Sequence, residues 1–123
     1  MADTADTNES VERHRLGVTR AVVDGVTVVT VSGEVDHHTS SVLRQALTPE
    51  DPGAAAHTVA DFAGVTFMDS SGINVLISAH QAHEPAGWLR LAGVRRSVLR
   101  TLEIVGLTTL LDCYPSVREA LGS

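Results

Sequence analysis

The chain has 123 residues and a formal net charge of −6, with 43% hydrophobic and 20% charged residues. This length and composition suit one globular domain and exclude a disordered chain. The excess of acidic over basic residues disfavours general nucleic-acid binding, which needs a basic surface to release counterions.

The first residues and the single cysteine indicate the compartment. Residues 1–15 are polar and contain no apolar run, so they predict a flexible polar tail rather than a signal peptide. No window reaches the roughly 18 consecutive apolar residues that a membrane span needs. Cys113 has no second cysteine to pair with, which favours a reducing compartment. We therefore expect a cytoplasmic protein that does not contact the membrane.

The first regular elements are two Val-rich runs. The runs 18–23 and 26–31 flank Asp24-Gly25, and this pair predicts a tight hairpin because both central turn positions need positive φ. The second run is too apolar for a strand with one face exposed to solvent. We therefore expect this strand to lie centrally in its sheet. Ser32-Gly33 is predicted to end this strand.

Helices and strands alternate along the rest of the chain. The apolar spacing predicts a helix over 39–47 and a strand over 58–62, followed by an apolar segment over 65–68 that leads into a helix up to about His83. It then predicts a strand over 88–91, a helix over 97–105, a short edge strand over 110–113, and a final short helix that begins at Ser116. An opening hairpin followed by this alternation predicts an α/β domain with a mixed sheet.

The most informative segment is Asp69-Ser70-Ser71-Gly72, which lies between an apolar segment and an amphipathic helix. Its hydroxyls and carboxylate therefore stand at a helix N-terminus, where backbone N–H groups are unpaired and the partial charge is positive. Ser and Asp at such a place are preferred caps. A phosphate is also well placed there, and a phosphoserine would add about −1.5 to −2 charges. The two interpretations are compatible, because a capping segment can also be phosphorylated.

Two segments of the chain carry recognisable motifs. One is Phe67-Met68-Asp69-Ser70-Ser71-Gly72-Ile73 followed by Val75-Leu76-Ile77, and the other is Gly33-Glu34-Val35-Asp36-His37-His38-Thr39, a Gly-Glu-x-Asp turn after the second strand. Together they resemble the signatures of bacterial anti-sigma factor antagonists of the STAS family. The resemblance extends from about residue 16 to the C-terminus. It implies a polar tail over 1–15 and a single STAS domain over 16–123, with about four to five strands and helices packed largely on one face.

The resemblance also implies a mechanism known as partner switching. The unphosphorylated antagonist would bind an anti-sigma factor, which is also a serine kinase that uses ATP, and so free a sigma factor for a stress response or sporulation. The kinase would phosphorylate Ser70, the serine directly after the Asp of the motif, and the complex would loosen. A PP2C-type phosphatase would reverse the modification. The antagonist itself would be a monomer without a cofactor.

The resemblance assigns the remaining site residues to the partner-binding surface. Asp69 would flank and position the phosphate acceptor, while Ser71 and Gly72 would shape the helix start. Three residues of the neighbouring loop would contact the partner: Glu34, Asp36 and His37. Asp36 also fits a plain helix cap.

Other functions find less support in the sequence. His37-His38 are adjacent and cannot readily share one metal ion, and the pair His80 and His83 offers too few ligands. The motif around Ser70 lacks the Gly-x-Ser-x-Gly elbow of hydrolases, and the chain has neither a phosphate-binding loop nor any lysine. We therefore expect no enzyme and no metal site. The alternative function is a STAS interaction module without a phosphorylation switch, in a stress-signalling or transporter complex.

Overall fold

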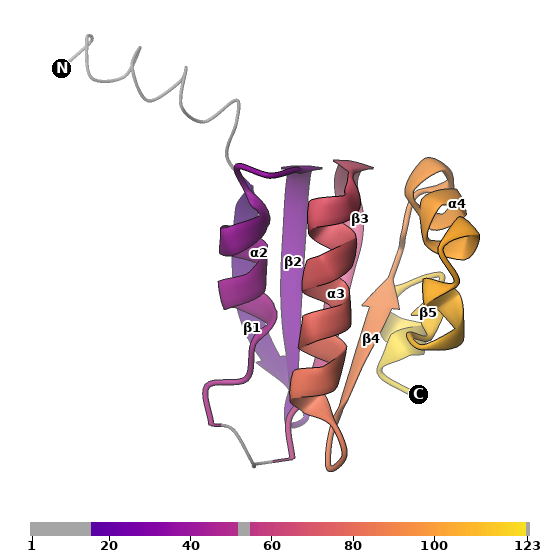
Figure 1. Cartoon of the computed structure of the whole chain (residues 1–123). Helices are drawn as coiled ribbons and strands as arrows, with labels where there is room; N and C mark the ends of the chain where they lie inside the picture. The colour runs from indigo at the N-terminus through magenta and orange to yellow at the C-terminus, as the bar shows by residue number, and fades with distance from the viewer. Residues whose placement is uncertain (1–15, 52–54, 123) are drawn as a thin grey trace, which may run out of the picture.

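The structure, a computed structural model, describes residues 16–51 and 55–122. Its centre is a five-stranded sheet in the order β1-β2-β3-β4-β5 (Figure 1). β1 (Gly17–Val23) pairs antiparallel with β2 (Val26–Val35), and every later pair, through β3 (His57–Met68), β4 (Trp88–Ala92) and β5 (Cys113–Tyr114), is parallel. The predicted α/β class with a mixed sheet is confirmed. The tail predicted over residues 1–15 lies outside the described residues.

Most helices cover one face of the sheet. Figure 1 shows α2 (Ser40–Leu47) and α3 (Ser70–His83) side by side in front of the strands, with α4 (Arg96–Ile104) beyond β4. The short α5 (Val117–Ala120) packs on the other face. This placement follows from its Ala120, which belongs to a separate apolar cluster with Val28, Val59 and Ala92. The chain neighbours of those strand residues belong to the main core, and side chains alternate between the faces of a strand.

The opening hairpin agrees with its sequence. Asp24 has φ of 52° and Gly25 has φ of 82°, as a two-residue turn with two left-handed positions requires. β2 lies between β1 and β3, so its predicted central place is confirmed.

The predicted strand ends after the hairpin were wrong. Ser32-Gly33 does not end β2, which continues to Val35, and the strand predicted over 58–62 continues through the apolar segment 65–68 as the single strand β3. The reason is strand pairing. β2 and β3 remain paired up to their last residues, Val35 and Met68, and two register shifts accommodate the extra residues of β3. Such bulges keep a strand paired through a stretch that lacks regular alternation.

The C-terminal elements also differ in detail from the prediction. The edge strand expected over 110–113 is β5, two residues long, and it is preceded by the 3-10 turn η1 (Leu107–Thr109). The final helix follows the predicted capping residue, since Ser116 Oγ accepts a hydrogen bond from Glu119 N at 3.3 Å. None of the described helices is long and apolar enough to span a membrane.

Candidate partner-binding site

The two sequence segments with the family signatures meet at one edge of the sheet. β2 and β3 are parallel neighbours whose last residues, Val35 and Met68, are paired. Asp69 N donates a hydrogen bond to Val35 O at 3.1 Å, which joins the two strand ends. The turn that follows β2 and the N-terminus of α3 therefore lie beside each other, although about 30 residues separate them in the sequence.

Asp69 caps α3. Its backbone is extended, and its Oδ1 accepts a hydrogen bond from Ser71 N at 2.8 Å. Its carbonyl accepts the first helical bonds, from Gly72 N at 3.1 Å and Ile73 N at 3.3 Å. The predicted cap is confirmed. One of the unpaired N–H groups of the first turn is thus satisfied by a carboxylate, and the helix end holds the adjacent Ser70 in a fixed position.

Ser70 is the first residue of α3 and is exposed to solvent. Within the ranges that the structure describes, no hydrogen bond occupies its hydroxyl. A modifying enzyme can therefore reach the Oγ atom without unfolding the helix. The positive end of the helix favours an anion at this place, although the Asp69 carboxylate already supplies one negative charge.

Gly72 is buried under the helix start rather than displayed on the surface. A Cβ atom there would lie 2.6 Å from Met68 Cγ and 2.7 Å from Val35 Cγ1. These distances are far below van der Waals contact, so only glycine lets α3 approach the two strand ends this closely. Ser71, the residue before Gly72, is half-buried.

The neighbouring turn is tied together by Asp36 and Thr39. Asp36 Oδ1 accepts hydrogen bonds from His38 N at 2.8 Å and Thr39 N at 3.1 Å, while Thr39 Oγ1 donates to Glu34 O at 2.8 Å. Desolvation alone would raise the pKa of the Asp36 carboxyl, but the hydrogen bonds from Thr39 and His38 outweigh it and lower that pKa. The carboxylate of Asp36 therefore orders this turn. His37 in the turn and Glu34 in β2 are both exposed to solvent.

Sequence reasoning assigned no role to Phe67, which the structure leaves 48% exposed next to Glu34 in the strand register. A signal was present. Aromatic residues make up only 3% of the chain, and this one stands three positions before Ser70.

The opposite end of α3 carries a buried histidine. His83 is 2% exposed, with Nδ1 2.7 Å from Ala79 O and Nε2 2.8 Å from Thr58 Oγ1. The carbonyl of Ala79 can only accept, so Nδ1 carries the proton and Nε2 accepts from the Thr58 hydroxyl. Burial lowers the pKa of His83, and the hydrogen bond to Ala79 only partly opposes this effect.

His80, the other histidine considered as a metal ligand, lies in a different environment. His80 Nε2 lies 3.4 Å from a carboxylate oxygen of Glu84, which makes an ion pair when the imidazole is protonated. Among residues 16–51 and 55–122, no three His, Cys, Asp or Glu side chains are grouped to hold a metal ion.

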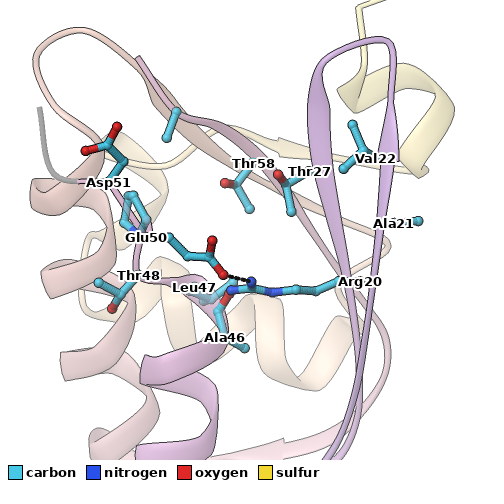
Figure 2. A pocket seen from close by; sticks show the side chains of 12 residues that line it. Arg20, Ala21, Val22, Thr27, Ala46, Leu47, Thr48, Glu50, Asp51 and Thr58 are labelled. Atoms are coloured by element: carbon cyan, nitrogen blue, oxygen red, sulfur yellow. Dashed lines mark hydrogen bonds and ion pairs between the residues drawn. The ribbon is translucent and has the colours of Figure 1, made fainter. Parts of the chain in front are cut away.

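A hollow of about 560 Å³ lies at the other edge of the sheet, at the amino ends of β2 and β3 (Figure 2). Arg20 crosses it: its Nη1 lies 3.3 Å from Glu50 Oε2, and its Nη2 donates to Ala46 O at 2.6 Å. None of the predicted site residues lines this hollow. It is therefore separate from the edge that carries Ser70.

Comparison with known proteins agrees with this geometry. The chain is 31% identical over 99 residues to the anti-sigma F factor antagonist of Paenibacillus polymyxa, covering 79% of this chain and 85% of the relative. The crystal structure of an anti-sigma factor antagonist from Mycobacterium paratuberculosis superposes with a TM-score of 0.77 at 27% identity, over 86% of this chain and 91% of that one.

A third comparison shows how widely the fold occurs. The mouse anion transporter Slc26a9 matches with a TM-score of 0.72 at 19% identity, over 95% of this chain but 24% of the transporter. At that identity only the fold is shared. The family profile described as STAS domain matches residues 18–120. The chain therefore belongs to the STAS domain family.

Proposed function

We propose that this chain is an anti-sigma factor antagonist whose binding is switched off by phosphorylation of Ser70. The observation that carries the proposal is the exposed Ser70 hydroxyl at the capped N-terminus of α3, which is joined to the end of β2, near the exposed residues Glu34 and His37 in sequence. The names of the relatives supply the class of partner, an anti-sigma factor.

The partner in this proposal is also the kinase. It transfers the γ-phosphoryl group of ATP to Ser70 Oγ, the serine proton passes to a base of the kinase, and ADP is released. The transfer requires the ATP phosphates to face Ser70 in the complex. After transfer the phosphoserine and the ADP phosphates are negative groups at one place, so they repel each other and the complex dissociates. A PP2C-type phosphatase hydrolyses the phosphoserine and restores the binding form.

The fold is suited to this cycle because the added charge lies at the positive end of a helix. The domain stays folded in both states, and only the interface changes. Asp69 fixes the helix start, Ser71 and Gly72 set its geometry, and Glu34, Asp36 and His37 supply the adjacent contact surface. Gly72 acts through the packing under α3, since it is buried.

The direct test uses each serine-kinase anti-sigma factor of the source genome, purified in turn and incubated with this chain and ATP. We expect one of them to add a single phosphate at Ser70, located by mass spectrometry. Ser70→Ala should abolish the modification, and the matched variant Ser71→Ala should retain it. Phosphate on Ser71, or on no serine, would contradict the switch.

Binding measurements complete the test. Ser70→Asp should weaken binding to that anti-sigma factor, while Ser70→Ala should bind like the wild type and stay bound when ATP is present. Equal binding by the two variants, with no phosphate incorporated, would leave the unswitched STAS interaction module as the function.

A further inference from the structure

Phe67 is an aromatic residue that the fold turns outward at the edge that carries Ser70. From the bulge beside it, its exposure and its neighbours, we propose that Phe67 is the apolar anchor of the partner interface and inserts into an apolar pocket of the anti-sigma factor, next to the bound ATP. This inference rests on the proposed function, and it adds a contact that the charged and hydroxyl residues of the site do not provide.

The outward direction of Phe67 results from a bulge in β3. Gly33 pairs with Val65, but the next residue of β2, Glu34, pairs with Phe67, so Thr66 is an extra residue. Val65 is buried, and without the bulge strict alternation would bury Phe67 as well and expose Met68. The extra residue reverses this: Met68 faces the core and Phe67 faces solvent. Bulges commonly re-aim side chains next to functional sites.

The buried neighbours confirm which side of the sheet Phe67 occupies. Val35 and Met68 are paired and both belong to the main core. Their predecessors, Glu34 and Phe67, are also paired, and alternation points them away from that core. A half-exposed phenyl ring therefore lies beside an exposed carboxylate, at the end of the sheet where the helix with Ser70 begins.

Phe67 and Ser70 are close enough along the chain for one partner protein to cover both. Three residues of extended chain span at most about 11 Å, so the Cα atoms of Phe67 and Ser70 are no further apart than that. A standard interface covers about 800 Å² on each partner, which is a patch roughly 30 Å across. A patch of that size around Ser70 extends far enough to include Phe67 at the end of β3, although the Phe67 side chain points away from the main core. Aromatic residues desolvated near the centre of an interface contribute most of the binding energy.

An exposed apolar residue at the other end of the sheet offers a comparison. Val22 is 73% exposed but pairs with Thr27 at the beginning of β2, at the opposite end of the strand from Glu34. It therefore serves as a matched control: a Val22→Ala variant also truncates an exposed apolar side chain on a strand, away from the proposed interface.

The test measures the dissociation constant of the anti-sigma factor that phosphorylates Ser70, by calorimetry in the presence of ADP. We expect Phe67→Ala to weaken binding about tenfold to a hundredfold. Phe67→Leu, which keeps an apolar side chain, should lose less, and Val22→Ala should bind within about twofold of the wild type. Thermal unfolding of each variant verifies that the domain remains folded.

The outcomes separate this inference from the proposed function. If Phe67→Ala binds as tightly as Val22→Ala while Ser70 still takes up phosphate, the anchor is refuted and the switch stands. If the wild type binds no serine-kinase anti-sigma factor, both are refuted. If Phe67→Ala is folded and binds weakly while Val22→Ala binds normally, the anchor is supported.

Discussion

The two ends of α3 differ in whether their environment can hold a charged group. At the N-terminal end Ser70 is exposed, and the nearest carboxylate, that of Asp69, is satisfied by a backbone N–H group. At the C-terminal end His83 is buried, hydrogen-bonded to the hydroxyl of Thr58 and the carbonyl of Ala79, and its burial lowers its pKa. The same helix thus has one end that can accept a negative charge in water and one end from which charge is excluded.

This difference supports the proposed switch, because a charge added at Ser70 would not disturb the contacts that hold α3 in place. The packing that fixes α3 lies along its buried face and at its C-terminal end, where His83 connects the helix to the beginning of β3. The N-terminal end needs only the Asp69 cap and the close approach at Gly72. A modification at Ser70 therefore alters the surface and leaves the contacts that hold the helix in place.

The largest expected effect is that of a negative charge placed at the buried end. His83→Asp removes both hydrogen bonds of the imidazole and buries a carboxylate that has no positive partner, so we expect a loss of about 3 kcal/mol or more in the free energy of unfolding. Urea unfolding at pH 8, monitored by circular dichroism, gives the value. His83→Gln is the control, because its amide can still donate and accept and should cost clearly less. Equal losses in the two variants would show that charge is not the cause.

A second prediction concerns the pH dependence that His83 adds. The folded state favours its neutral form, so its pKa is lowered, and His57 and His80 act in the same direction as the burial. Below the unfolded pKa of about 6.5, the unfolded chain binds the proton more readily, so stability is present above that pH and is lost as the pH falls. The slope from this group cannot exceed about 1.4 kcal/mol per pH unit.

The measurement compares the wild type with His83→Gln between pH 8 and pH 5. The difference in unfolding free energy between them should be constant above pH 7 and should shrink below about 6.5. His80 and its partner Glu84 are present in both proteins, so their titration largely cancels. Parallel stability curves down to pH 5 would mean that His83 does not carry the effect.

How much of this contrast was predictable from the sequence depends on the kind of signal. The cap at the exposed end was predictable from local chemistry, because Asp directly before an apolar helix is a preferred N-cap. The hairpin at Asp24-Gly25 is an equally local signal. The buried end had a weaker signal. His83 continues the inward spacing of Leu76 and Ala79, but its partner Thr58 is 25 residues away in the sequence.

The orientation of Phe67 could not be predicted, for a physical reason. It depends on the register between β2 and β3, and the extra residue at Thr66 leaves no mark in the pattern of apolar residues. For the same reason the sequence predicts a strand that ends at Phe62, whereas β3 continues to Met68. Pairing partners distant in the sequence decide such positions, and a shift of one residue changes every side chain to the other face.

A third, smaller effect is expected from removing the cap at the exposed end. Asp69→Ala leaves Ser71 N without its acceptor at 2.8 Å and should lower the free energy of unfolding by about 1 kcal/mol. Asp69→Asn keeps an acceptor oxygen at the same place and should lose less. Chemical unfolding of both variants at pH 7 checks the prediction. A loss near 3 kcal/mol would show that this end is as essential to the fold as the buried one.

The smallest expected effect is the most informative one. Ser70→Asp places a carboxylate at the first position of α3, where the positive helix end should stabilise it by about 0.3–1 kcal/mol at low salt. Ser78→Asp, at an exposed position in the middle of the same helix, is the control and should gain nothing from the helix end. Thermal unfolding at low and high salt separates the two, because salt screens the favourable term. A Ser70→Asp variant less stable than the wild type would mean that charge here loosens the helix. The switch would then have to act through the fold of the domain and not through repulsion at its surface.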